Sequence, residues 1–145
     1  MIAKILLATD GSPSAADAAA LAAEIASCTG ATVTVLSVVQ PTPLIDFAPV
    51  YPGMVDESVN LAHSEVERQV EKLRKAGVKA EAVVEISPSV DGTIVDIAES
   101  LHADLIVMGT HGHSALARAI LGSTADRVLR GTRTPLLFAR HEEQA

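Results

Sequence analysis

The 145-residue chain contains one cysteine, no tryptophan and only 2% aromatic residues. A single cysteine cannot form a disulfide within the chain, so we expect a reducing compartment. Cys28 lies in an alanine-rich helical stretch, which predicts a small buried residue. Few aromatic rings are available to stack on nucleic-acid bases. The apolar share of 48% is made mainly of Ala, Val, Ile and Leu, which suits helices packed closely on a sheet.

Positive charge is also scarce, since 11 Lys and Arg stand against 18 Asp and Glu, for a net charge of -7. General nucleic-acid binding depends on a basic surface, so we expect no nucleic-acid partner. The basic residues are unevenly spread: between Leu105 and Arg140 there are five arginines and one acid, Asp126. This local positive charge suits a compact polyphosphate better than a long duplex.

No long uninterrupted apolar run is present. The apolar stretch at 2–8 is broken by Lys4 and is too short for a signal peptide followed by a cleavage site. Residues 25–45 lack charge but contain glycine and proline, which argues against a membrane span. We therefore expect a single domain over residues 1–145, located in the cytoplasm, with no membrane partner.

Short apolar segments alternate with helical patterns along the chain. Strands are predicted at 3–9, 32–39, 78–86, 104–108 and 135–140, and helices at 13–28, 55–77, 91–101 and 123–130. Residues 40–54 carry four prolines and predict an irregular segment. The strands are apolar on both faces, which is typical of parallel sheets. We expect an α/β fold with one open five-stranded parallel sheet, helices on both faces and right-handed crossovers.

The first predicted strand runs into Asp10-Gly11-Ser12-Pro13, which supplies a turn, an N-cap serine and a proline at the first helical position. Two roles are open to the Asp10 carboxylate. It can accept hydrogen bonds from ribose hydroxyls or lie near a metal, or it can organise its own turn. Ligands of open α/β sheets bind beyond the carboxyl ends of the strands, here residues 8–10, 38–39 and 108–109.

Three glycines, at 109, 112 and 122, follow the fourth predicted strand, and Ser123-Thr124 follow the last of them. Glycine lets backbone N–H groups approach an anion, and the start of a helix adds unpaired donors and a favourable dipole. The spacing matches neither the P-loop, which needs a Gly-Lys pair, nor the dinucleotide GxGxxG loop. The segment therefore predicts an anion-binding loop, with Ser123 also serving as a helix N-cap.

The sequence carries no HExxH, GxSxG or CxxC motif and no obvious pairing of a nucleophile with a base. His111 and His113 have no third metal ligand near them, so we predict that they lie along the phosphate path or in solvent. The catalytic residues are unknown, and no metal site built from side chains is predicted.

The segment GTHGHSALARAILGS carries the signature G-x2-G-x9-G-[S/T], and with it the chain resembles the ATP-binding members of the universal stress protein family. The opening KILLATDGSPSA and the segments TVTVLSVV, DLIVMGTHG and TPLLFAR are also similar to that family, so the resemblance covers nearly the whole chain. It implies a Rossmann-like sheet with strand order 3-2-1-4-5. It also implies a homodimer that pairs through the last strand, Pro135 to Arg140.

The ligand that the resemblance implies is ATP, with Mg2+ or Mn2+ as a companion. Asp10 would lie toward the sugar, and the glycines and hydroxyls after the fourth strand would hold the phosphates. The implied nucleotide-binding residues are Ala8, Thr9, Asp10, Val38, Met108, Gly109, His111, Gly112, Gly122, Ser123 and Thr124.

The implied function is that of an ATP-binding, dimeric regulatory protein, in which the nucleotide changes the conformation of the dimer or its choice of an unknown protein partner. Slow ATP hydrolysis stays open. The alternative is a dimeric interaction module of the same fold without a working nucleotide site. A response-regulator receiver would need a phosphoacceptor Asp at the end of the third strand, where the chain has Val84-Glu85-Ile86-Ser87. In the family, that strand often ends with a glycine where this chain has Ile86.

Overall fold

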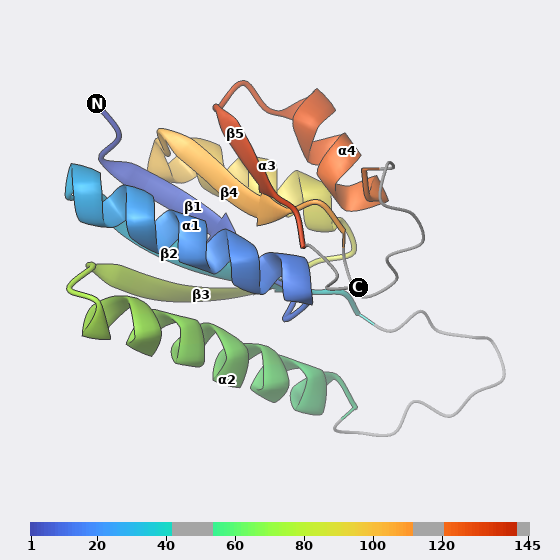
Figure 1. The fold of residues 1–145 in the computed structure, drawn as a ribbon. Coiled ribbons are helices and arrows are strands. Elements are labelled where there is room, and N and C mark those ends of the chain that lie inside the picture. The colour runs from blue at the N-terminus through green and yellow to red at the C-terminus, as the bar shows by residue number, and fades with distance from the viewer. Residues whose placement is uncertain (42–53, 112–120, 142–145) are drawn as a thin grey trace, which may run out of the picture.

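The structure, a computed structural model, describes residues 1–41, 54–111 and 121–141. Its sheet consists of β1 (Lys4–Ala8), β2 (Thr32–Val39), β3 (Ala80–Ile86), β4 (Leu105–Gly109) and β5 (Leu136–Ala139). The helices are α1 (Pro13–Thr29), α2 (Met54–Lys75), α3 (Val90–Leu101) and α4 (Ser123–Gly131). The strands pair in parallel in the order β3-β2-β1-β4-β5, which confirms the predicted α/β fold (Figure 1). The irregular segment predicted at 40–54 falls mostly outside the described residues.

The central strand β1 shows why the strands are apolar throughout. Leu7 pairs with Val35 of β2 on one side and Val107 of β4 on the other, and all three side chains are fully buried. Leu6, the next residue, is equally buried although its side chain points to the opposite face of the sheet. Both faces of the sheet are therefore covered.

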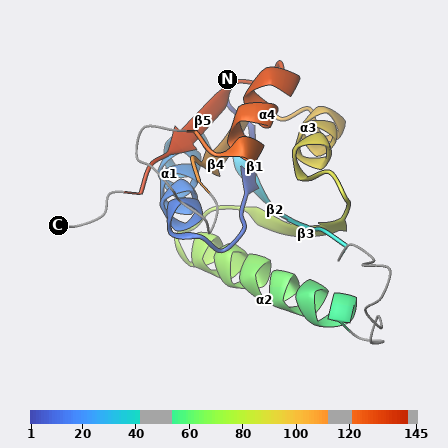
Figure 2. The same cartoon turned by 90° about the vertical axis from the view of Figure 1, so that its right-hand side faces the viewer.

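Two separate cores fill the space between the sheet and its helices. One core joins Ile5 and Leu7 to α1 and α2, whereas the other joins Leu6 and Ile106 to α3 and α4. Figures 1 and 2 show the corresponding layers, with α1 and α2 on one face and α3 and α4 on the other. The prediction of helices on both faces is confirmed. Among the described residues, none of the helices is both long and apolar enough to span a bilayer.

Helix α1 packs against the sheet through small residues. Ser12 is its N-cap, Pro13 follows as predicted, and Gly30 ends the helix in the left-handed conformation. Ala22 and Ala26 are buried against the sheet. The prediction that Cys28 is buried is wrong, because a step of two residues from Ala26 turns the side chain by about 200° around the helix, and Cys28 is exposed.

Helix α4 begins differently from the prediction. The N-cap is Gly122, and Ser123 is the first residue of the helix, so the assignment of Ser123 as the N-cap is wrong. A Cβ atom built on Gly122 would lie 2.8 Å from the carbonyl oxygen of Thr110. The cap position thus has no room for a serine side chain.

Candidate functional site

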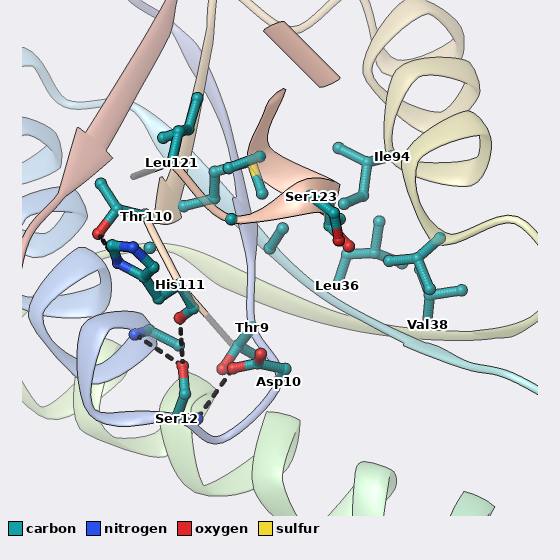
Figure 3. A pocket seen from close by; sticks show the side chains of 18 of the residues that line it. Thr9, Asp10, Ser12, Leu36, Val38, Ile94, Thr110, His111, Leu121 and Ser123 are labelled. Carbon is teal, nitrogen blue, oxygen red and sulfur yellow. Dashed lines mark hydrogen bonds between the residues drawn. The ribbon is translucent and has the colours of Figure 1, made fainter. Parts of the chain in front are cut away.

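A pocket of about 560 Å³ opens at the carboxyl ends of β1, β2 and β4, beside the start of α4 (Figure 3). It lies where the strand order reverses, between β1 and β4, which is the usual ligand position in open α/β sheets. Its volume is within the range of small-molecule sites. The predicted binding residues that line it are Ala8, Thr9, Asp10, Val38, Met108, Gly109, His111, Gly122, Ser123 and Thr124. Gly112 lies outside the described residues.

One side of the pocket is apolar. Leu36 and Val38 come from the end of β2, and Val90 and Ile94 come from the first turns of α3 (Figure 3). The sequence analysis missed the contribution of α3, because the amphipathic pattern of that helix does not say which part of the sheet it covers. Gln40 also lines the pocket, and its Nε2 donates to the carbonyl of Pro88 at 3.3 Å, tying the end of β2 to the segment before α3.

The backbone N–H and C=O groups of Val38 also face the apolar side of the pocket. The carbonyl of Leu36 accepts a hydrogen bond from Thr9 N–H on the β1 side, and the carbonyl of Val39 accepts one from Ser87 N–H on the β3 side, each at 2.9 Å. Backbone groups alternate in direction along a strand, so the N–H and C=O of Val38 point the same way as those of Leu36. The register of β1 ends at Ala8 opposite Leu36. The Val38 groups therefore point past the end of β1, toward the pocket.

The turn after β1 is held by its own side chains. Asp10 Oδ1 accepts a hydrogen bond from Ser12 N–H at 2.9 Å, and Thr9 Oγ1 accepts one from Gly11 N–H at 3.3 Å. Gly11 has a φ of 78°, which favours glycine at this position. Asp10 thus organises its turn, one of the two roles left open by the sequence. A carboxylate can accept several hydrogen bonds, so this role does not exclude contact with a ligand.

Gly109, the last residue of β4, and Gly122 are both required by close packing that the sequence analysis did not foresee. A Cβ atom on Gly109 would lie 2.2 Å from Ser14 Oγ and 2.8 Å from the Ser14 backbone carbon. Gly109 thereby lets the start of α1 pack directly on the end of β4. Gly122 N–H donates to the Thr110 carbonyl at 2.7 Å, which fixes the start of α4 against the same strand end.

This contact changes which groups face an anion. Because Gly122 N–H already has an acceptor, the donors at the start of α4 are the N–H groups of Ser123, Thr124 and Ala125, which have no acceptor within the helix. All three residues line the pocket, and the helix dipole adds partial positive charge there. Among the described lining residues there is no lysine or arginine. Arg130, on the exposed side of α4, pairs with Asp126 at 3.1 Å.

The buried hydroxyls of Ser12 and Ser14 join the start of α1 to the segment after β4, a connection that the sequence analysis did not foresee. Ser14 Oγ donates to the carbonyl of His111 at 2.5 Å, and Ser12 Oγ approaches the same carbonyl at 3.4 Å. The imidazole Nδ1 of His111 lies 3.0 Å from Thr110 Oγ1. Only the long separation in sequence, 97 residues between Ser14 and His111, hid this contact from pattern reasoning.

No cluster of three or more His, Cys, Asp or Glu side chains with metal-binding geometry occurs within the ranges that the structure describes. Asp10 is the one carboxylate among the described lining residues, so it is the acidic side chain that could contact a divalent cation held by a bound phosphate group or by water. Mg2+ sites in nucleotide-binding proteins often have this composition.

The sequence profile of the universal stress protein family matches residues 1–140, and the chain belongs to that family. A universal stress protein of Methanocaldococcus jannaschii is 35% identical over 140 residues, covering 94% of this chain and 81% of the relative. Universal stress protein A homolog 1 of Coxiella burnetii is 33% identical over 131 residues, covering 86% of this chain and 87% of the relative.

Solved structures of the family share the fold. Universal stress protein UspA from Lactobacillus plantarum superposes with a TM-score of 0.80 at 24% identity, covering 96% of this chain and 98% of its own. A universal stress protein in complex with cAMP gives 0.75 at 23% identity, covering 97% and 99%. The protein from Archaeoglobus fulgidus in complex with dAMP gives 0.70 at 24%, covering 96% and 98%. The last two of these proteins were thus solved with an adenine nucleotide bound.

Proposed function

We propose that this chain is a nucleotide-dependent regulatory protein that binds ATP in the pocket at the ends of β1, β2 and β4. The observation that carries the proposal is the composition of that pocket, which combines an apolar wall on one side with the start of a helix on the other. The complexes of relatives with cAMP and dAMP support an adenine nucleotide as the ligand class.

The apolar side suits the base. Leu36, Val38 and Ile94 would contact the faces of adenine, while the Val38 N–H and C=O would meet its Watson–Crick edge. Adenine presents an acceptor at N1 beside a donor at N6, which complements one N–H and one C=O. Guanine presents the reverse order, so a base held in the same place would set acceptor against acceptor and leave buried polar groups unpaired. The proposal therefore includes a preference for ATP over GTP.

The polar side suits the sugar and phosphates. Asp10, at the end of β1, would accept hydrogen bonds from the ribose hydroxyls. Ser123 and Thr124 would donate backbone N–H and hydroxyl groups to phosphate oxygens at the start of α4, where the helix dipole favours an anion. Mg2+ or Mn2+ would join the phosphates and offset their charge, since the lining residues that the structure describes include no lysine or arginine.

We further propose that the protein acts as a cytoplasmic homodimer. Among the strands of the described ranges, β5 pairs with β4 alone, and Leu136, Leu137 and Phe138 remain partly exposed. Pairing of two β5 strands would cover this edge, which would otherwise present unpaired backbone groups. Bound ATP would then bias the conformation of the dimer or its choice of protein partner. Slow ATP hydrolysis, which would need a positioned water and stabilisation of the developing charge, is not part of the proposal.

The proposal is tested by purifying the protein, denaturing it and identifying the small molecules released. We expect an adenine nucleotide in the supernatant, in an amount that approaches one per chain when ATP and Mg2+ are supplied during purification. A folded protein that neither retains nor takes up ATP would contradict the proposal and would favour the alternative, an interaction module of the same fold without a working nucleotide site.

A further inference from the structure

Ser14 is the least expected polar residue in the first turns of α1. The helix begins PSAADAAALAAE, so alanine is common around it, and alanine has a higher helix propensity than serine. The Ser14 side chain is nonetheless buried, with 4% of its surface exposed. A buried hydroxyl needs a hydrogen-bond partner, and here the partner lies outside the helix.

That partner is the carbonyl of His111, to which Ser14 Oγ donates at 2.5 Å. The second hydroxyl near this carbonyl, Ser12 Oγ, is farther away at 3.4 Å and also accepts the capping bond from Ala15 N–H. Ser14 therefore makes the shorter of the two serine hydroxyl contacts to the His111 carbonyl. Gly109 packs against Ser14, and this close approach is possible because glycine has no Cβ atom.

The hydrogen bond between Ser14 and His111 is connected to two parts of the polar side of the pocket. His111 lines the pocket, and Thr110, the residue before it, accepts the hydrogen bond from Gly122 N–H at the start of α4. A shift of the backbone at His111 would therefore move both the pocket lining at that residue and the anchor of the α4 donors. The apolar side, formed by β2 and α3, shares no hydrogen bond with Ser14.

We infer that Ser14 is a positioning residue for the phosphates of the bound nucleotide, acting through the His111 carbonyl without touching the ligand. The inference rests on the proposed function and deepens it, because it separates the part of the chain that holds the phosphates from the part that holds the base and sugar.

The test measures the dissociation constants of ATP and of adenosine by titration calorimetry, for the wild-type protein and for Ser14→Ala. The Ser14–His111 hydrogen bond is present with and without ligand, so its full net contribution, equivalent to about three- to tenfold in an equilibrium constant, is the upper bound on the change in affinity. We expect Ser14→Ala to weaken ATP binding by about three- to tenfold at most, while adenosine binding changes less than about twofold. The matched control is Ser37→Ala, which removes another buried hydroxyl, on β2, that does not line the pocket. It is expected to leave both affinities unchanged.

The outcomes separate the alternatives. The inference would be overturned if Ser14→Ala weakened the binding of ATP and adenosine equally, or weakened the binding of neither. The hydroxyl would then serve only the packing of α1. Should Ser14→Ala fail to fold, Ser14→Cys keeps a weak donor, and a selective but smaller loss of ATP affinity is expected for it. Wild-type protein that binds neither compound would overturn the proposed function itself, and the inference with it.

Discussion

The substitution Gly122→Ala tests the close contact between α4 and the end of β4. The added Cβ would lie 2.8 Å from the carbonyl oxygen of Thr110 and 3.4 Å from Cα of His111. Both neighbours are backbone atoms, so no flexible side chain can move aside. The hydrogen bond from Gly122 N–H to that carbonyl, 2.7 Å long, would have to lengthen as α4 moves away.

The loss of stability expected for Gly122→Ala follows from this geometry. Overpacking at a well-packed contact typically costs about 1–3 kcal/mol, and replacing glycine with alanine recovers about 0.4–1 kcal/mol by restricting the unfolded chain. We therefore expect Gly122→Ala to lower the free energy of unfolding by about 1–2 kcal/mol. Urea denaturation without nucleotide measures this value. The same displacement should weaken ATP binding at least about tenfold, since the N–H groups of Ser123 and Thr124 move with the start of α4.

Gly131→Ala is the matched control. Its Cβ would meet only Val95 Cγ2, at the ordinary distance of 3.6 Å, and Gly131 has no positive φ. It lies at the other end of α4 and outside the pocket lining. We expect it to be neutral or to stabilise the fold by about 0.5 kcal/mol, with unchanged ATP affinity. If Gly122→Ala is as stable as Gly131→Ala and binds ATP like the wild type, the conclusion that the Thr110 carbonyl leaves no room for a side chain at position 122 is refuted.

Two further predictions concern other parts of the fold. Hydrogen bonds from the backbone N–H groups of Ala3 and Lys4 lower the pKa of the Asp104 carboxyl, so its stabilising effect is present above the unfolded value near 3.8 and is lost as the pH falls through the lower folded pKa. Asp104→Asn should therefore be less stable than the wild type in urea at pH 7, with the difference closing in strong acid; a difference that grows toward low pH would contradict this. Replacing Leu137 on β5 with arginine should convert the proposed dimer into a monomer in analytical ultracentrifugation, because a charge would enter the joined edge; an unchanged dimer would place the interface elsewhere.

The sheet could be predicted because its signals are local. The segment Thr32–Val39 is β-branched and apolar on both faces, and the structure makes it a strand with those bounds. Ser12 and Pro13 likewise mark the start of α1, since an N-cap and a first-turn proline act on the nearest backbone. Such features depend on neighbours within a few residues, which a single sequence displays directly.

The errors and omissions depend on contacts between distant segments. Serine is a favoured N-cap, yet Gly122 takes that position because the Thr110 carbonyl leaves no room for a side chain. The sequence predicts Gly109 as part of an anion loop, and the residue does line the pocket, but its close contact with Ser14 is visible only in the structure. The role of α3 in the pocket, through Val90 and Ile94, also arises from packing across the sheet. None of these contacts leaves a periodic or short-range signal.

The most direct test of the central claim is a calorimetric titration of nucleotide-free wild-type protein with ATP and, separately, with GTP, both in the presence of Mg2+. The account predicts saturable binding of about one ATP per chain and at least tenfold weaker binding of GTP, as expected when a base leaves buried polar groups unpaired. No ATP binding by folded protein, or equal affinity for the two nucleotides, would contradict the assignment of this pocket as an adenine nucleotide site.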